Sequence, residues 1–429
     1  MVMNKKKHKK MNPSDMYHLM GIREQECTCA KYSGSVAVLY VRTKKNEFYC
    51  AKCGSRHVIR SGVVEREFRS VPVGGKPVVV RMRVQRLECK ECGSVSQEHI
   101  HFAKPGRSYT RRMATYVVDL SRVMTLKAVS AFTGLSWNTV KEIVETYLER
   151  HYSRPDLSEV TVIGIDEFAV KKGHVYKTIV VDLLSGRILY VGDGKGAEAL
   201  DGFWRRLGDS KAKIKAVAMD MSGAFVSAVR ANLPQASIVF DHFHVVKLVN
   251  EALDKVRRRV VREEKDKESK EAERRKAAGL EPVGGTPRSS IVKGTRYILL
   301  RSHCNIEKKK DIERLNAALE LNKDLSTAYY LKEEASLIWK CDNKGQAAMQ
   351  LSAWLAGLRA SEIPELLVLA DTISDHRDGI LAYYDTPIST GPVEGINNKI
   401  KTLKRMAYGF RDDHYFKLRL LALHDFKVA

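Results

Sequence analysis

The 429-residue sequence has no run of about 18 consecutive apolar residues, the length that a membrane-spanning helix requires. Its 28 glycines and 11 prolines are too few for a collagen-like or low-complexity chain. Polar residues follow the basic stretch 1–10, where a secretory signal requires an apolar run. With 44% hydrophobic residues the chain can nevertheless bury a core. These features predict a soluble, cytoplasmic protein of about three domains with no membrane partner.

Acidic residues are scarce relative to basic ones. The sequence has 51 Asp and Glu residues against 74 Lys and Arg residues, which gives a formal net charge of +23. Proteins usually carry such an excess to neutralise the phosphates of a nucleic acid. An anionic membrane surface is the other polyanionic candidate, but no amphipathic anchor supports it. The charge therefore favours a nucleic-acid partner.

A disulfide framework is not expected for the eight cysteines of a cytosolic chain of this length. Four of them form two C-x-x-C pairs 35 residues apart, Cys50 with Cys53 and Cys89 with Cys92. Four thiolates are what a closed tetrahedral zinc site needs. Four unrelated buried cysteines, or a redox pair, are the alternatives, and the spacer exceeds the roughly 15–20 residues common in such sites. The other cysteines are scattered, and we treat Cys27 and Cys29 as free thiols.

A β-hairpin is predicted between the two cysteine pairs, over Val63–Leu87. Apolar and polar residues alternate in its second half, and Gly74 and Gly75 supply the turn. Such a hairpin would bring the two cysteine pairs together. We therefore expect a zinc ribbon over residues 46–105.

A helical region is predicted for residues 111–150, and its middle has the layout of a helix-turn-helix. Gly134 permits the turn, and Ser136 is a favourable N-cap for the second helix. The exposed start of that helix would present Trp137, Asn138 and Lys141 to a DNA groove. Helical hairpins with glycine turns are also common in plain bundles, so the DNA-binding interpretation depends on the net charge and on the adjacent zinc site. The predicted inner face of the first helix consists of Ala128, Val129 and Phe132.

From residue 160 onward, aliphatic strands alternate with helices. Three strands, a helix, a strand, a helix and a strand are predicted, in this order: 160–166, 175–184, 187–192, 197–207, 214–220, 224–233 and 236–241. In such an order the first and fourth strands can lie side by side. Asp166 ends the first and Asp220 the fourth, so their carboxylates would project close together and could hold a divalent metal.

Glu394 is the best candidate for a third acid. It lies near the start of the last predicted helix, and Asn398, Lys401 and Arg405 follow on the same face. An acid followed by amide and basic groups suits a phosphodiester with bound metal, so these three side chains are candidate DNA contacts. Taken singly, each acid is an ordinary strand-end or helix-start residue, and acids near a helix start are favoured electrostatically in any case. The combination points to a metal centre.

Four motifs in this order resemble those of bacterial insertion-sequence transposases of the ISL-three family. They are Ile163–Glu167, Met219–Ser222, Asp241–His244 and Gly391–Lys401. The resemblance implies a zinc ribbon, a helix-turn-helix and a ribonuclease-H-like catalytic domain with an Asp-Asp-Glu triad. By it, Asp166, Asp220 and Glu394 are the catalytic acids that bind Mg²⁺ or Mn²⁺, and a helical insertion separates the second acid from the third.

The choice of the second acid stays open at this point. Asp241 also ends a strand and has His244 nearby, as in the D-x-x-H signature of the insertion-bearing group. Strand order favours Asp220, because the fourth strand adjoins the first in the ribonuclease-H-like fold. His244 is interpreted as a structural residue or a DNA contact. Glu167 is expected on the opposite strand face from Asp166, away from the metal.

The predicted fold class is a multidomain α+β and α/β chain. Its parts are a basic segment (1–45), the zinc ribbon (46–105), the helix-turn-helix domain (106–155), the first part of the ribonuclease-H-like core (156–244), the helical insertion (245–388) and the C-terminal helices of the core (389–429).

The predicted function is DNA transposition. The protein would bind double-stranded DNA at transposon ends, cleave it with metal-activated water and join the freed 3′-hydroxyl to target DNA, as a homodimer associated with the bacterial nucleoid. A ribonuclease-H-like nuclease or resolvase without strand transfer is one alternative. A non-catalytic DNA-binding regulator is the other.

Overall fold

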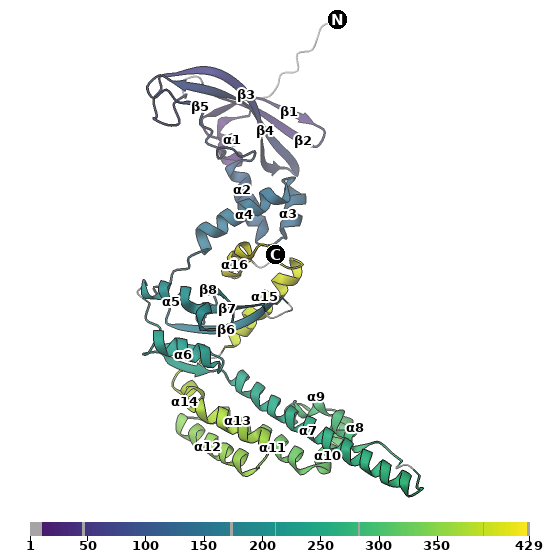
Figure 1. Ribbon diagram of the computed structural model, residues 1–429. Coiled ribbons are helices and arrows are strands. Elements are labelled where there is room, and N and C mark those ends of the chain that lie inside the picture. The colour runs from purple at the N-terminus through teal and green to yellow at the C-terminus, as the bar shows by residue number, and fades with distance from the viewer. Residues whose placement is uncertain are drawn as a thin grey trace. The chain divides into compact units, whose positions relative to one another are not determined.

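The computed structural model describes residues 11–44, 48–171, 175–210, 212–281, 284–388 and 390–426. The basic stretch predicted at residues 1–10 lies outside them. The chain divides into two compact units, residues 1–155 with 398–429, and residues 156–397. Figure 1 labels the elements of both. None of the helices in the described ranges is long and apolar enough to cross a membrane.

The amino-terminal part of the first unit contains a five-stranded sheet in the order β1-β2-β4-β3, with β5 paired to β4. Gly74 and Gly75 join β3 to β4 with φ angles of 57° and 74°, a region that favours glycine. The predicted hairpin is thus confirmed, and it is longer than expected. Helix α1 (Pro13–Met20) and two strands from the unassigned segment 1–45 belong to the same unit. The strands are β1 (Gln25–Ser33), β2 (Val36–Thr43), β3 (Val58–Val73), β4 (Lys76–Cys89) and β5 (Val95–Gln97).

The alternation of β4 decides which face of this sheet is buried. Side chains two residues apart point to the same face of a strand. The buried set packs with Phe68 and Phe102, whose rings meet edge to face at 5.1 Å. The buried residues of β4 on this face are Val78, Val80, Met82 and Val84.

The first unit also includes α2 (Arg111–Ser121), α3 (Leu126–Thr133), α4 (Trp137–Tyr152) and α16 (Asp413–Leu421). Gly134 ends α3 in the left-handed conformation, and the Ser136 hydroxyl accepts a hydrogen bond from Thr139 N–H at the start of α4. The predicted turn and N-cap are therefore confirmed. Phe132 differs from the prediction, because it is 60% exposed. The inner face of α3 consists instead of Leu126, Val129 and Thr133.

Helix α16 packs against α4, although the sequence predicts residues 389–429 to lie with the catalytic core. The difference arises because α16 and the residues after it bury an apolar face among the helix-turn-helix residues, and the boundary between the two units falls after Asn397. The apolar residues that this segment adds to the cluster are Tyr415, Leu418, Ala422 and Phe426.

The second unit contains a five-stranded sheet in the order β10-β9-β6-β7-β8. The first strand, β6, pairs antiparallel with β7 and parallel with the fourth, β9, as the ribonuclease-H-like prediction requires. Its strands are β6 (Val162–Lys171), β7 (Val175–Asp182), β8 (Ile188–Asp193), β9 (Ala216–Met219) and β10 (Ser237–Phe240). The crossover helices are η2 (Ala197–Leu200), α5 (Asp201–Gly208) and α6 (Gly223–Asn232). They bury Phe203 and Phe225 completely.

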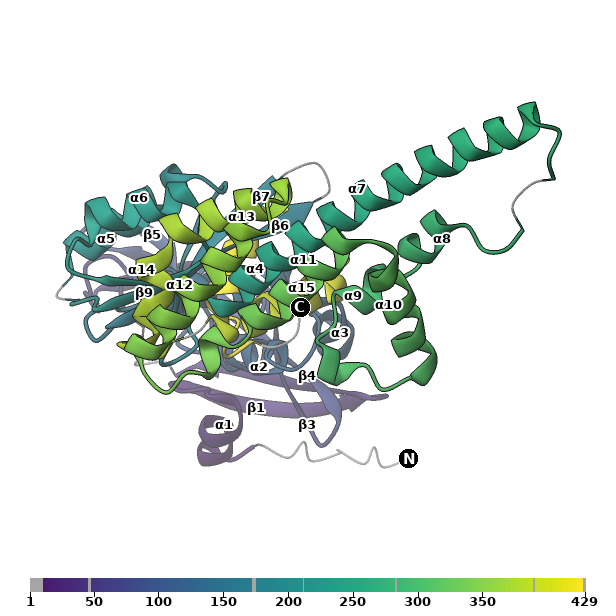
Figure 2. The ribbon, with the colours of Figure 1, turned by 90° about the horizontal axis from the view of Figure 1, so that it is seen from below.

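A long helix, α7 (His242–Ala277), begins the predicted helical insertion. Apolar residues spaced three or four apart bury its inner face, from Val245 to Val260, against α11 and α13. The end of α7 extends beyond the other insertion helices (Figure 2). Those helices are α8 (Arg288–Lys293), α9 (Arg296–Leu299), α10 (Lys309–Leu321), α11 (Lys323–Ala335), α12 (Lys344–Ala360), α13 (Pro364–Asp375) and α14 (Arg377–Leu381), with short η3 (His303–Asn305), η4 (Ile338–Lys340) and η5 (Ala382–Tyr384). Helix α15 (Gly391–Met406) follows the insertion.

The packing of α16 generates a stability prediction. Phe426 is fully buried against Tyr147 and Tyr152, with the Arg122 guanidinium 4.8 Å from its ring centre. Phe426→Ala should therefore destabilise the helix-turn-helix unit by about 3–5 kcal/mol, although the residue lies far from it in sequence. Thermal unfolding checks this, with Tyr408→Ala as the control because that side chain is fully exposed. Equal melting temperatures for the two variants would contradict the packing.

Candidate functional site

The four paired cysteines come together at one end of the hairpin. Their sulfur atoms all lie within 4.8 Å of one another, with 3.7 Å between Cys50 and Cys92 and 3.5 Å between Cys53 and Cys89. Four sulfurs at about 2.3 Å from a central zinc would lie roughly 3.8 Å apart, so the cluster fits zinc closely. Among the described side chains, this is the one group of three or more His, Cys, Asp or Glu whose ligand atoms gather within that distance.

Both C-x-x-C pairs have the same local backbone. Gly54 N–H donates to the Cys50 carbonyl at 2.9 Å, and Gly93 N–H donates to the Cys89 carbonyl at 3.0 Å. The Ser94 hydroxyl lies 3.2 Å from the Cys50 sulfur, and this hydrogen bond lowers the pKa of the Cys50 thiol to about 6. A thiol with a lowered pKa is already largely the thiolate that zinc binds. Cys27 and Cys29 lie in β1, outside the cluster.

The start of α4 exposes two of the three predicted DNA-reading side chains. Trp137 is 48% exposed and Asn138 is exposed beside it. The exposed ring of Phe132 lies on the preceding helix, so the turn displays two aromatic side chains. Phe132 is a candidate contact that the sequence pattern assigned to the core.

Lys141 is placed differently from these two. Its ammonium forms ion pairs with Asp412 and, at 3.4 Å, with Glu145, and its side chain is only 20% exposed. Although burial opposes it, the hydrogen bond to Asp412 raises the pKa of Lys141. Asp412 is also the N-cap of α16. Lys141 therefore joins α4 to α16, and reaching DNA would require it to leave these carboxylates.

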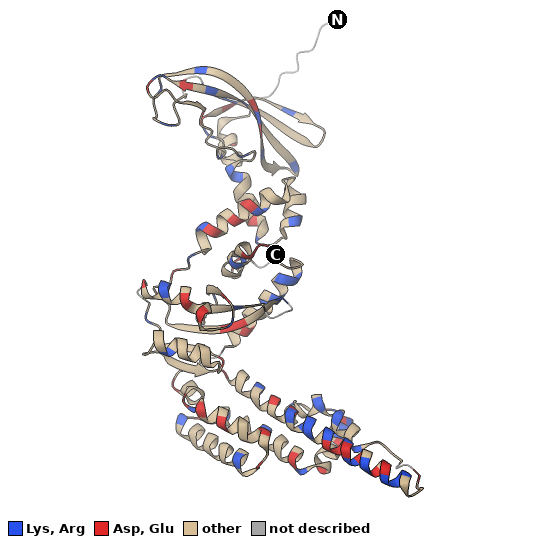
Figure 3. Ribbon diagram, in the orientation of Figure 1, with Lys and Arg blue, Asp and Glu red and all other residues tan. Residues whose placement is uncertain are grey.

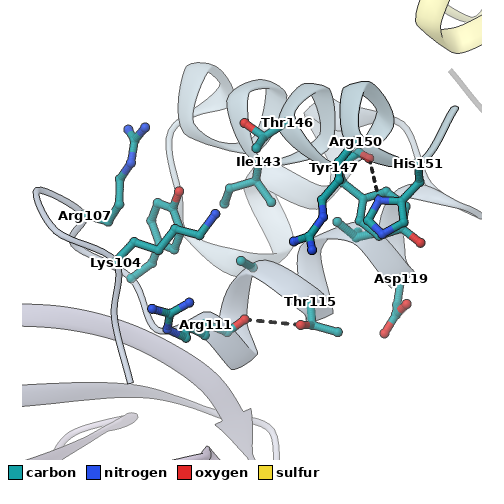
Figure 4. Close-up of a pocket in the computed structure, with 13 residues that line it drawn as sticks. Lys104, Arg107, Arg111, Thr115, Asp119, Ile143, Thr146, Tyr147, Arg150 and His151 are labelled. Atoms are coloured by element: carbon teal, nitrogen blue, oxygen red, sulfur yellow. Dashed lines mark hydrogen bonds between the residues drawn. The ribbon is translucent and has the colours of Figure 1, made fainter. Parts of the chain in front are cut away.

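A cavity of about 370 Å³ lies between α2 and α4 and has basic side chains on its walls (Figure 4). Lys104 and Arg107 come from the segment before α2, Arg111 from its first turn and Arg150 from the end of α4. The Arg107 guanidinium is bound by Glu142 at 2.7 Å. Sequence reasoning missed this cluster, although the density of basic residues from 104 to 112 could have indicated it.

In the second unit, the strand register brings Asp166 and Asp220 to the same level. Gly164 of β6 pairs with Ala218 of β9; Asp166 lies two residues further along β6, and Asp220 lies one residue beyond the end of β9 at Met219. The charge of Asp220 acts on the pKa of Asp166, so the two carboxylates lie near each other. Strand β6 continues to Lys171, past the end predicted at residue 166, because its last residues pair with β7.

Helix α15 crosses β6 where the first aspartate lies. Gly164 permits this close approach, since a β-carbon there would lie 2.6 Å from Val393. One turn later, the Asn397 amide donates a 2.6 Å hydrogen bond to Asp166. The other Asp166 oxygen accepts the Glu167 backbone N–H at 2.8 Å, and Asp220 accepts the Ser222 N–H at 3.0 Å. Both aspartates are thus held in fixed orientations.

Glu394 lies in the first turn of α15, between Val393 and Asn397 in sequence, and its side chain is exposed. The three carboxylates do not gather as closely as the four cysteines do. The Asn397 amide oxygen is buried and has no hydrogen-bond partner among the described residues. Carboxylate and amide oxygens are the ligands that Mg²⁺ prefers, so the donor set fits a hard divalent cation.

Burial raises the pKa of the Asp166 carboxyl, and the negative charge of Asp220 acts in the same direction. His244 and the Asn397 hydrogen bond act against this rise, so both lie close to the carboxylate. Burial also raises the pKa of Glu167, which the charge of Asp220 raises further. A cluster of acids whose charged forms are disfavoured is where a bound cation would be most stabilising.

Asp241 is occupied by structural hydrogen bonds. It is 7% exposed, and one of its oxygens accepts the Phe243 N–H at 2.9 Å as the N-cap of α7. The other accepts the Thr390 N–H at 3.1 Å, directly before α15. Asp241 therefore fixes the start of the helix that bears Glu394. The remaining predicted contacts, Asn398, Lys401 and Arg405, are exposed along α15.

The cysteine cluster predicts one zinc ion per chain. Replacing Cys50 and Cys89 with Ser should abolish zinc retention and lower the melting temperature, because binding a structural zinc is part of the folding free energy. Elemental analysis of purified protein measures the first effect and thermal unfolding the second. The matched control replaces Cys27 and Cys29, and retained zinc in the Cys50 and Cys89 variant would disprove the site.

Three family models match the chain. A transposase model matches residues 163–420, the helix-turn-helix domain of transposase family ISL3 matches residues 98–148, and the zinc finger of transposase IS204/IS1001/IS1096/IS1165 matches residues 47–92. The solved Drosophila P element transposase strand transfer complex aligns with 73% of this chain and 91% of its own at a TM-score of 0.36 and 10% identity, too distant a likeness to support a conclusion.

Curated relatives match over most of their length. The transposase for insertion sequence element IS1001 of Bordetella parapertussis is 32% identical over 391 residues, 91% of this chain and 92% of that protein. The transposase for insertion sequence element IS1557 of Mycobacterium tuberculosis is 30% identical over 369 residues, 84% of this chain and 82% of that protein. The chain belongs to the ISL3 family of DNA transposases, the family that its sequence motifs indicate.

Proposed function

We propose that this transposase cleaves and joins DNA with a metal centre formed by Asp166, Asp220 and Glu394. The parallel pairing of β6 with β9 supports this most strongly, because it brings two carboxylates to one level of the sheet. The Asn397–Asp166 hydrogen bond then ties the helix that bears the third acid to the same place. Mg²⁺ or Mn²⁺ bound there would activate the attacking oxygen and stabilise the leaving oxygen of an in-line displacement.

The chain's own residues prepare this centre in three ways. Backbone N–H groups and Asn397 orient the two aspartates before any ligand arrives. Asp241 fixes the start of α15, the helix that bears Glu394. His244 lies close enough to Asp166 to lower the pKa of that carboxyl, which favours the carboxylate that a cation would bind.

DNA recognition is assigned to the first unit. Exposed Trp137 and Asn138 at the start of α4 would contact base edges, while Lys141 holds α4 against α16 through Asp412. The basic cavity between α2 and α4 and the exposed Asn398, Lys401 and Arg405 would contact phosphates. We also propose that the active complex contains two copies of the chain, one for each transposon end.

A nuclease or resolvase that cleaves without joining is the second candidate function. It would need the same metal centre, so the geometry of the acids does not separate it from a transposase. Joining assays that start from a pre-cut 3′ end do. Joined product supports strand transfer, and cleavage without joining supports the nuclease.

The triad generates a prediction on catalysis. Asp166→Ala, Asp220→Ala and Glu394→Ala should each reduce cleavage and joining of end DNA in Mg²⁺ or Mn²⁺ by more than about 100-fold. Loss of residues that only orient metal ligands already costs 10–100-fold, and these variants lose a ligand itself. Binding of the same DNA in Ca²⁺ should remain, because none of the three substitutions removes a proposed contact to bases or phosphates.

Asp241→Ala is the internal control for the second acid. It removes the N-cap of α7, which costs about 1 kcal/mol of stability, and loosens the start of α15. It should therefore lower the melting temperature yet keep more cleavage activity than Asp220→Ala. An inactive Asp241→Ala beside an active Asp220→Ala would show that the second metal ligand is Asp241 and not Asp220. Full activity in all four variants would refute the metal centre.

The exposed start of α4 generates a separate prediction. Asn138→Ala should reduce discrimination between terminal-repeat and random DNA by about 1–3 kcal/mol, because base contacts determine specificity. Lys141→Ala should instead lower the melting temperature, since it leaves Asp412 and Glu145 without their cation. Competition binding with both DNAs and thermal unfolding measure the two effects. Unchanged discrimination in Asn138→Ala would contradict the proposal that the start of α4 reads the DNA sequence.

A further inference from the structure

Helix α7 has a strongly charged segment that the proposed catalysis does not use. The segment from residue 255 to 276 contains 17 charged residues, eleven basic and six acidic. Figure 3 shows basic residues along α7 where α8 and α9 lie beside it. Charged helices are often merely solvated, with acids and bases paired along their surface. The ion pairs of α7 depart from that pattern, because some of its exposed basic residues have no acidic partner among the described residues.

A groove of about 800 Å³ runs along this part of α7. Seven of its nine lining residues are basic. The single acid, Glu365, is already bound by Arg259 at 3.0 Å. The lining is therefore strongly positive, and Val261 is its one apolar residue. The basic residues on which the argument depends are Lys255, Arg258, Arg262, Lys265, Lys293 and Arg296.

Some acids of α7 pair with groove cations and others pair outside the groove. Asp254 is buried and pairs with three groove residues, Arg257, Arg258 and, at 3.6 Å, Arg296. Glu263 pairs with Arg259, which also binds Asp324, and Glu264 is buried and pairs with Lys267.

Four cations of the groove have no such partner. Within the described part of the chain they form no ion pair with any carboxylate. Lys255 lies at the start of the charged part of α7 and Arg262 lies in its middle. Lys265 lies about one turn further on, and Lys293 belongs to α8. All four are exposed.

The groove adjoins a second hollow of about 330 Å³ that leads toward the start of α7. The two share Arg258 and Arg296, and the second reaches Lys247 and Phe243 in the first two turns of α7, with Glu251 and Asp254 also in its lining. Phe243 lies two residues after Asp241, whose second oxygen accepts the Thr390 N–H directly before α15. From Lys247 to Lys265 the helix rises about 27 Å, which corresponds to roughly eight base pairs of DNA.

We propose that this face of α7, together with α8 and α9, binds the phosphate backbone of the duplex DNA that leads away from the cleaved bond. The proposal rests on the proposed catalytic function, because it places the DNA by reference to the acids. Charge complementarity identifies the occupant: the surface offers unpaired cations along roughly 15 Å of α7, from Lys255 to Lys265, and one more on α8. Seven of the nine groove residues are basic, whereas the core of a protein interface is depleted of charged residues. Phosphate contacts of this kind position DNA without reading its sequence.

The test removes three of the unpaired cations. In the full-length protein carrying Arg262→Ala, Lys265→Ala and Lys293→Ala, the dependence of binding on salt is measured with a random-sequence 40-base-pair duplex. Each lost phosphate contact should reduce the slope of log K against log salt by about 0.9, so a reduction of about 2.7 is expected. The matching Gln variant keeps a flexible polar side chain without the charge and should behave alike, which separates lost charge from misfolding.

The matched control is Lys308→Ala, Lys309→Ala and Lys310→Ala, which removes the same charge from exposed positions of the same insertion. Its slope should stay at the wild-type value. An equal loss in both triple variants would reduce the effect to net charge and overturn the proposal, as would an unchanged slope in the groove variant. Loss of binding to anionic lipid vesicles with an unchanged DNA slope would assign the groove to a membrane and overturn it as well.

Cleavage of end DNA by the wild-type protein is measured in parallel. Wild-type cleavage together with an unchanged slope in the groove variant refutes the groove alone. Absence of wild-type cleavage together with the expected change in slope refutes the catalytic proposal and leaves the groove as a DNA-binding surface.

Discussion

The parallel pairing of β6 with β9 is the constraint on which the candidate catalytic centre depends. Three residue pairs, ending with Gly164 and Ala218, fix the register that carries Asp166 and Asp220 to one level. A slip of one residue would turn one of the aspartates to the other face of the sheet. The absence of a side chain at Gly164 then lets Val393 approach, so the same short stretch of β6 positions two acids and the helix that bears the third.

The sequence was sufficient for most of this architecture because the relevant signals are local. Gly74 and Gly75 predict the hairpin, Gly134 and Ser136 predict the turn and N-cap, and β-branched runs predict the strands. The cysteine spacing predicts the zinc cluster for the same reason. Each of these features depends on the identity and spacing of a few residues, which the sequence shows directly.

Other features depend on contacts between distant segments, and the sequence could not supply them. Phe132 has the helical spacing of a core residue, but it is 60% exposed among the described residues. Lys141 has the position of a groove contact, but Asp412, 271 residues later, binds it. Asp241 resembles a metal ligand until Thr390 is seen to use its second oxygen. In all three cases the decisive neighbour comes from tertiary structure.

The position of α16 has a consequence for any attempt to isolate the helix-turn-helix as a fragment. Its hydrophobic core includes Tyr415, Leu418 and Phe426, which follow the catalytic core and the helical insertion in the sequence. A fragment cut after α4 would lack both the apolar cover of α16 and the carboxylate of Asp412 that holds Lys141. Its α4 would be left with an uncovered apolar face and a cation without its partners. The autonomous folding unit is therefore discontinuous in sequence, and the catalytic core is inserted within it.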